Sequence, residues 1–128
     1  MRKIRKRGKM VEFSDLIGKT IIHIEGLEPS NDHIKFYIDN NKYYQMCNFW
    51  REFEEDVYIK EVEGDIKDLI GTPIVEAEVV KEDSKERECL HYTFYKFRTN
   101  KDYFTITWTC NDSAFYSQDV DFEYVEED

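Results

Sequence analysis

The chain contains three histidines and three cysteines, the residue types most often used for acid–base, nucleophilic and metal chemistry: His23, His33, His91, Cys47, Cys89 and Cys110. No two histidines have the i, i+4 spacing of a helical metal site, and no Cys-x-x-Cys pair accompanies them. Cys47 lies in "QMCNFW", without a glycine elbow or an adjacent base that could activate its thiol. The five glycines form no phosphate-cradling loop. These patterns predict no zinc site, no catalytic nucleophile and no cofactor.

Carboxylates are far more abundant, with 28 Asp and Glu residues in 128. A glycosidase-type pair could be drawn from so many acids, which makes that pattern unspecific. The segment "EVEGDIKD" crowds four carboxylates around one glycine and is the closest approach to a site for a hard cation. It lacks the ligand order of an EF-hand loop, so solvated charge is the favoured interpretation.

Charge is distributed unevenly along the chain. The first nine residues carry six basic side chains and no acid, and without them twelve Lys and Arg face 28 acids, so residues 10–128 carry about −16. A body this negative repels nucleic acid and anionic membranes and attracts basic surfaces. Residues 1–10 are interpreted as a basic, flexible tail, with a nucleic-acid-binding arm and a sorting signal as alternatives.

Two stretches of the chain repeat each other. "DLIGKTIIHIE" (residues 15–25) and "DLIGTPIVEAE" (residues 68–78) are identical at six of eleven positions, and "DVYIKEVEGD" later matches "DVDFEYVEED". Between these markers each half holds two aromatic runs around a turn, near residues 40–41 and 100–101. The second half is longer by about ten residues, and "KEDSKERE" (residues 81–88) is the predicted surface insertion. The pattern indicates one domain, residues 11–128, built of two repeats (about 11–66 and 67–128).

Strand periodicity decides the fold class. In "DYFTITWTC" Phe104, Ile106, Trp108 and Cys110 alternate with polar residues, and in "DVDFEYV" Val120, Phe122 and Tyr124 are expected inward with Asp119, Asp121 and Glu123 outward. A single hairpin unit cannot bury its apolar face alone, so the two repeats must pack together. We expect a mainly β, pseudo-symmetric sandwich or open barrel of about eight strands, with short helical turns at the two Asp-Leu-Ile-Gly sites. A mixed α+β fold is the alternative.

Four segments read in order resemble an uncharacterised family of small proteins from phages and prophages: "FSDLIGKTIIHIEG", "EGDIKDLIGTPIVEAE", "TFYKFRT" and "YSQDVDFE". The resemblance covers most of residues 11–125 and implies a phage-type accessory protein without an assigned reaction. Members carry a stretch similar to His-x-Gln-Asp-Cys-Cys-Glu where this chain has "QMCNFWREFEEDVYI", so no functional residue is carried over.

Charge and resemblance together predict a binding role and not an enzyme. We expect an acidic surface that binds a host or phage protein with a basic surface, and an anti-defence inhibitor or DNA mimic is the sharpest form. The candidate partner-binding residues are Glu52, Glu54, Glu55, Asp56, Asp119, Asp121, Glu123, Glu126 and Glu127. The alternative is a small-ligand-binding protein or enzyme with a pocket between the repeats, supplied by the many aromatic residues.

The cellular location and the redox state of the cysteines are predicted from weaker signals. No apolar run approaches the ~18 residues of a membrane span, and no signal peptide follows the basic start. With an odd number of cysteines, this predicts reduced thiols in the cytoplasm of a bacterial host cell, away from the membrane. We expect no direct binding of nucleic acid by the acidic body. The oligomeric state is open, and a homodimer is one possibility because edge strands can pair.

Overall fold

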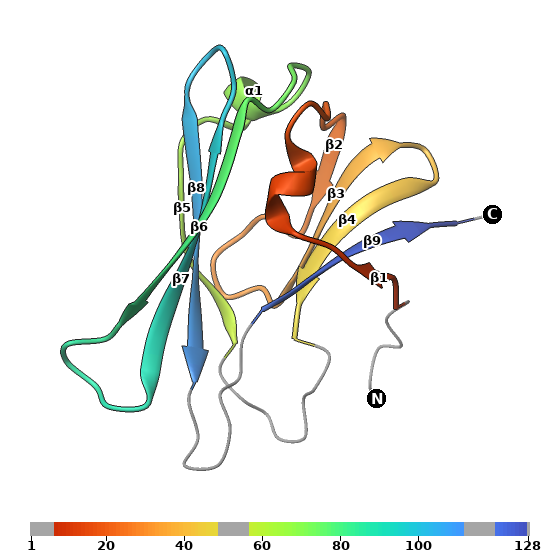
Figure 1. The fold of residues 1–128 in the computed structure, drawn as a ribbon. Helices are drawn as coiled ribbons and strands as arrows, with labels where there is room; N and C mark the ends of the chain where they lie inside the picture. The colour runs from red at the N-terminus through yellow and green to blue at the C-terminus, as the bar shows by residue number, and fades with distance from the viewer. Residues whose placement is uncertain (1–6, 49–56, 112–119, 128) are drawn as a thin grey trace.

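The computed structural model describes residues 7–48, 57–111 and 120–127, which form two antiparallel sheets packed face to face (Figure 1). The first sheet has the spatial order β1 (Lys9–Met10), β9 (Asp121–Glu126), β4 (Lys42–Cys47), β3 (His33–Asp39) and β2 (His23–Glu25). The second has the order β5 (Tyr58–Glu63), β8 (Tyr103–Asn111), β7 (Leu90–Arg98) and β6 (Glu76–Asp83). The helical segments are a 3-10 turn, η1 (Phe13–Leu16), and one α-helical turn, α1 (Ile66–Leu69). The predicted sandwich is confirmed.

The two repeats exchange their final strands. Strands β2 to β5 come from the first repeat and β6 to β9 from the second, yet β9 pairs with β4 and β5 pairs with β8. Each sheet is therefore completed by the last strand of the other repeat. The sequence does not reveal this exchange, because alternation shows which face of a strand is buried but not which strand lies beside it.

The repeated glycine turns bind each other where the repeats meet. The N–H of Gly18 donates to the carbonyl of Ile74 (2.7 Å), and the N–H of Gly71 donates to the carbonyl of Ile21 (2.9 Å). Both glycines have positive φ angles, 88° and 90°, which disfavour a side chain. They follow η1 and α1, the helical turns predicted at these sites. The repeated sequence thus forms two reciprocal backbone hydrogen bonds between the halves, which we call the glycine clasp.

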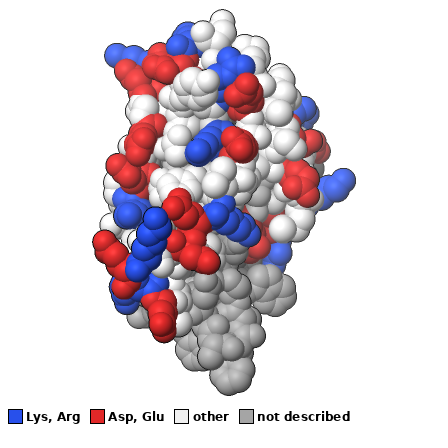
Figure 2. All heavy atoms as spheres, turned by 60° about the vertical axis from the view of Figure 1, so that its left-hand side comes forward, with Lys and Arg blue, Asp and Glu red and all other residues white. Residues whose placement is uncertain are grey.

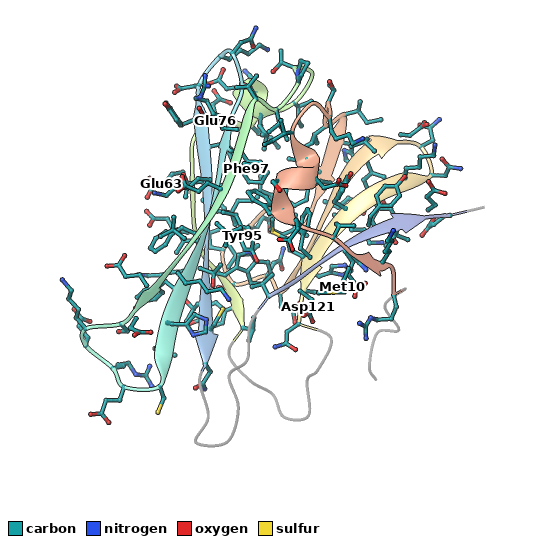
Figure 3. The ribbon with its side chains drawn as sticks, in the orientation of Figure 1. Met10, Glu63, Glu76, Tyr95, Phe97 and Asp121 are labelled. Atoms are coloured by element: carbon teal, nitrogen blue, oxygen red, sulfur yellow. The ribbon has the colours of Figure 1, made fainter. Side chains whose placement is uncertain are left out.

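The hydrophobic core lies between the sheets. Tyr95 and Phe97 point from β7 toward the first sheet (Figure 3), and both are buried. The ring of Phe13, from η1, lies 4.9 Å from each of them and 5.5 Å from Phe122 on β9, so η1 connects the two sheets. The predicted inward residues of β8 are confirmed by their burial: Phe104, Ile106, Trp108 and Cys110.

Two predicted boundaries differ from the structure. Lys9 and Met10, placed in the basic tail, instead form β1 and pair with β9. The charged insertion begins later than predicted, because β6 stays paired with β7 as far as Asp83. Charge alone misleads at both places, since an edge strand exposes most of its side chains and tolerates charged residues.

Candidate functional site

Five exposed carboxylates lie on or beside the first sheet: three at the end that carries the turn between β3 and β4, one opposite Lys35 on β3, and one on η1. They come from η1, from β2, from the end of β3 and from the end of β9 and the residue after it. We call them the acidic end: Asp15, Glu25, Asp39, Glu126 and Glu127. Four of the five accept a hydrogen bond from a tyrosine hydroxyl, so their positions are tied to the sheet.

On the outer face of the sheet, two tyrosines hold two of these carboxylates. Tyr37 and Tyr43 are cross-strand partners with ring centroids 5.1 Å apart. The hydroxyl of Tyr37 donates to Glu25 (3.4 Å), and that of Tyr43 donates to Glu127 (3.1 Å). The ammonium of Lys35 lies 5.0 Å from the ring centre of Tyr43, a cation–π arrangement. This face therefore already accommodates one cation between aromatic and acidic groups.

On the opposite face, the arrangement recurs with different residues. Tyr44 is buried and donates to Asp15 (2.8 Å), while Tyr124 donates to Glu126 (2.8 Å). The rings of Tyr44 and Tyr124 lie 5.0 Å apart on neighbouring strands. Carboxylates thus surround this end of the sheet on both faces.

Burial and the neighbouring acids together raise the pKa values of the tyrosine hydroxyls at this site. Burial is the largest cause that raises the pKa of Tyr43, to about 12, and the hydrogen bond to Glu127 adds to it. Burial and the hydrogen bond to Glu126 likewise raise the pKa of Tyr124 to about 12. The pKa values of Tyr37 and Tyr44 are also raised, by burial first and then by Glu25 and Asp15 respectively.

The acidic end is suited to binding cationic groups. A carboxylate that accepts one tyrosine hydroxyl keeps lone pairs for further donors. Charge-assisted bonds from Lys or Arg to such oxygens are stronger than neutral hydrogen bonds. The tyrosines hold the carboxylates in place, which lowers the entropy lost when a partner binds.

Glu123, a predicted outward acid, is fully buried, so that prediction is wrong. Its Oε1 accepts from the N–H of Gly8 (2.6 Å) and the side-chain amide of Gln45 (3.3 Å), and its Oε2 pairs with Arg7 (3.0 Å). His33 lies 2.9 Å from the amide oxygen of Gln45 and extends the network. A buried carboxylate is costly unless paired and hydrogen-bonded. Glu123 therefore anchors the N-terminal segment to the sheet and presents no charge to solvent.

The other predicted partner-binding residues divide into three groups. Glu126 and Glu127 are exposed and belong to the acidic end. Asp121 is half-buried opposite Cys47 on β4, at the other end of β9. The rest lie outside the described residues: Glu52, Glu54, Glu55, Asp56 and Asp119.

Three members of the acidic end escaped prediction: Asp15, Glu25 and Asp39. A usable signal existed for Asp39 alone, since it directly precedes the predicted turn at residues 40–41. The pairing of Tyr37 with Tyr43 depends on a β-bulge between Tyr37 and Asp39, so the turn alone does not place Glu25 near the Tyr37 hydroxyl. Asp15 gave no such signal, because η1 approaches Tyr44 only through the tertiary fold.

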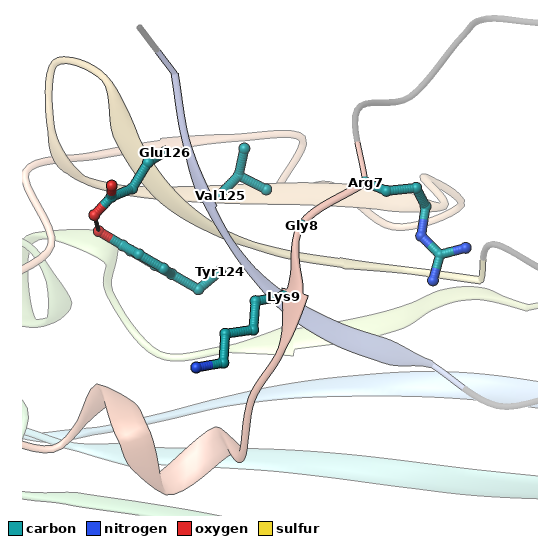
Figure 4. Close-up of a pocket in the computed structure, with 6 residues that line it drawn as sticks. All are labelled: Arg7, Gly8, Lys9, Tyr124, Val125 and Glu126. Atoms are coloured by element: carbon teal, nitrogen blue, oxygen red, sulfur yellow. Dashed lines mark hydrogen bonds between the residues drawn. The ribbon is translucent and has the colours of Figure 1, made fainter.

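The described part of the chain contains no group of three His, Cys, Asp or Glu side chains arranged to hold a metal ion. Cys47 and Cys110 are buried and Cys89 is exposed, and none forms a disulfide. A shallow depression of about 340 Å³ lies at the edge formed by β1 and β9, lined by Arg7, Gly8, Lys9, Tyr124, Val125 and Glu126 (Figure 4). The predicted alternative, a pocket between the repeats, stays a prediction. The described side chains there form one hydrophobic core.

Residues 14–122 match a family model described as a domain of unknown function (DUF7448), and the chain belongs to this family. Neither the curated proteins nor the solved structures give a match. Among the described residues, no helix has the length and apolar character needed to cross a membrane.

Proposed function

We propose that this member of the DUF7448 family is a binding protein whose acidic end receives a basic surface of a partner protein. One observation carries the proposal: carboxylates from three separate segments (η1, β2 and the end of β9) converge on the first sheet and are held there by tyrosine hydroxyls. The net charge of −10 supports it, because a negative body attracts basic partners over long range.

The second sheet differs in this respect. On its outer face, Lys and Arg side chains are interspersed with Asp and Glu (Figure 2). Arg98 pairs with Glu76 at 2.8 Å, and Lys96 is the cross-strand partner of Glu78. Mixed charge of this kind is typical of a solvated surface. The outer face of the second sheet therefore presents no continuous acidic surface, unlike the acidic end of the first sheet.

The resemblance to phage and prophage proteins supports an accessory role in a bacterial host cell, with a host or phage protein as the partner. Inhibition of a defence protein in the cytoplasm is the specific form we favour. If that target binds nucleic acid, the acidic end acts as a DNA mimic, because both present negative charge to the same basic surface.

Charge reversal tests the proposal. Glu25, Asp39, Glu126 and Glu127 are replaced by Lys, and the variant is compared with wild type in affinity capture from a bacterial lysate. Proteins are eluted along a salt gradient and identified by mass spectrometry. We expect wild type to retain a basic protein that leaves as salt rises, and the variant to lose it.

The matched control carries the same change in charge elsewhere: Glu61, Glu63, Glu86 and Glu88 to Lys. It should retain the partner. Equal loss in both variants would show that only total charge matters, and binding unaltered by reversal of the acidic end would refute the proposal. Elution of the partner by double-stranded DNA would identify the mimic, provided that circular dichroism shows all chains folded.

A further inference from the structure

The second sheet ends in a long edge strand, and η1 packs close to it on the side of the core. β6 spans Glu76–Asp83, and within the described residues it pairs with β7 alone. Its counterpart in the first repeat, β2, is only three residues long. An edge strand leaves a row of backbone N–H and C=O groups that can pair with another extended chain.

The register identifies which backbone groups face outward. The N–H of Ser84 donates to the carbonyl of Leu90 (2.9 Å), and β6 and β7 stay in one register from Glu76 to Asp83. Hydrogen-bonded and non-hydrogen-bonded pairs alternate in an antiparallel ladder. Residues 78, 80 and 82 therefore bond to β7, and the backbone groups of residues 77, 79 and 81 point away from the sheet.

The side chains along this edge are strongly patterned. Glu76, Glu78 and Glu82 alternate on the outer face, while Val79, which is 40% exposed, lies on the other face. With Asp83 and one lysine included, β6 carries a charge of about −3. A strand added beside it would place its own alternate side chains next to these acids and its intervening ones next to Val79.

A second copy of the chain fits this edge poorly. Antiparallel pairing of two β6 strands would bring Glu78 of one copy close to acids of the other, and like charges directly opposite each other destabilise a sheet. A segment with Lys or Arg at alternate positions turns the same contacts into attraction. Its charges would lie against Glu78 and Glu82, and its apolar residues against Val79.

We propose that β6 binds an extended segment of a partner protein by strand addition, and that this segment alternates basic with apolar residues. This surface lies on the second sheet, and its affinity comes from main-chain hydrogen bonds with specificity from the side chains. The proposal is independent of the acidic end and goes beyond the function proposed above.

The test uses a short acetylated peptide of alternating Lys and Val, titrated into the full chain and followed by fluorescence anisotropy. Val79→Pro removes the outward N–H without breaking the ladder to β7, a position that proline tolerates in an edge strand. Val79→Thr keeps the N–H and is the control. We expect Val79→Pro to weaken the Kd by about tenfold or more and Val79→Thr to change it by less than about twofold.

A second measurement keeps the proposal testable if Val79→Pro does not fold. A peptide N-methylated at every residue has no N–H to donate from either edge, and such a peptide should not bind. A peptide with Glu in place of Lys should also fail to bind wild type. Reversal of the acidic end should leave peptide binding unchanged, which separates this proposal from the first. No binding of the Lys–Val peptide, or equal binding by Val79→Pro, would overturn strand addition at β6.

Discussion

The ladders that join β9 and β5 to the two sheets carry different cross-strand pairs. Where β9 joins the first sheet, Gln45 faces the buried Glu123, and where β5 joins the second, Thr107 faces the exposed Glu61. At the other side of each sheet, the ring of His23 lies beside its partner Tyr37, whereas Glu76 forms an ion pair with Arg98. The backbone plan is shared, but the outward side chains have diverged.

This difference shows which parts of the duplicated unit the architecture needs. The glycine clasp and the inward apolar residues occur in both halves, because both sheets require them to pack. The outward positions of the first sheet carry the Glu123 network and the Tyr37 and Tyr43 side of the acidic end. The second sheet keeps a mixed, solvated surface and a long open edge.

The largest expected effect comes from removing the acids on the two exchanged strands, Glu123 on β9 and Glu61 on β5. Glu123→Ala should lower the free energy of unfolding by about 2–4 kcal/mol, because it removes the acceptor of the Gly8 N–H and of the Gln45 amide. Glu61→Ala should change it by about 0.5 kcal/mol or less, since that side chain is exposed. Chemical denaturation of both variants gives the two values. Similar losses would mean that the two exchange sites are energetically alike after all.

The glycine clasp should instead behave symmetrically. Gly18→Ala and Gly71→Ala each force a side chain into a positive-φ conformation, while the space around both positions is open. We expect each to cost about 1–2 kcal/mol, and the two costs to agree within about 0.5 kcal/mol. Thermal or denaturant unfolding measures both. A markedly unequal pair would contradict a clasp in which the halves contribute equally.

The smallest effect appears only at high pH. The folded state favours the neutral form of Tyr43 and Tyr124, whose pKa values are raised to about 12 by burial and by neighbouring acids. Their contribution to stability is therefore complete below the ordinary tyrosine pKa of about 10 and is lost as the pH rises toward 12.

Tyr43→Phe should move alkaline unfolding to higher pH and change stability little at neutral pH. Circular dichroism and tyrosinate absorbance, recorded together against pH, check this expectation. Ionisation of these tyrosines well before unfolding would show that the acidic end does not hold them neutral.

Periodicity in the sequence was enough to predict the sandwich, since residues such as Ile106 and Trp108 alternate with threonines as in a strand with one apolar face, although Thr107 and Thr109 are buried too. The duplication and the helical turns followed from the repeated Asp-Leu-Ile-Gly. The burial of Glu123 could not be predicted, because a charged residue on an alternating strand normally faces solvent. Its partner Arg7 lies 116 residues away in sequence, and no local pattern links them.

The acidic end was predicted only at Glu126 and Glu127. Because acids are abundant in the sequence, composition does not show which of them lie close together. Their clustering depends on strand register and on the approach of η1 to Tyr44. Long-range placement of this kind follows from the fold and not from composition.

The exchange of final strands also has a consequence for synthesis. β9 is made after every other described strand, yet it lies between β1 and β4 within the first sheet, and Gln45 must wait for Glu123, 78 residues later. Until then the aromatic edge of β4 stays open, a state prone to aggregation and recognised by chaperones. A chain cut short before residue 121 can never close that edge. The first sheet can therefore be completed only after the ribosome has translated β9, which ends at residue 126.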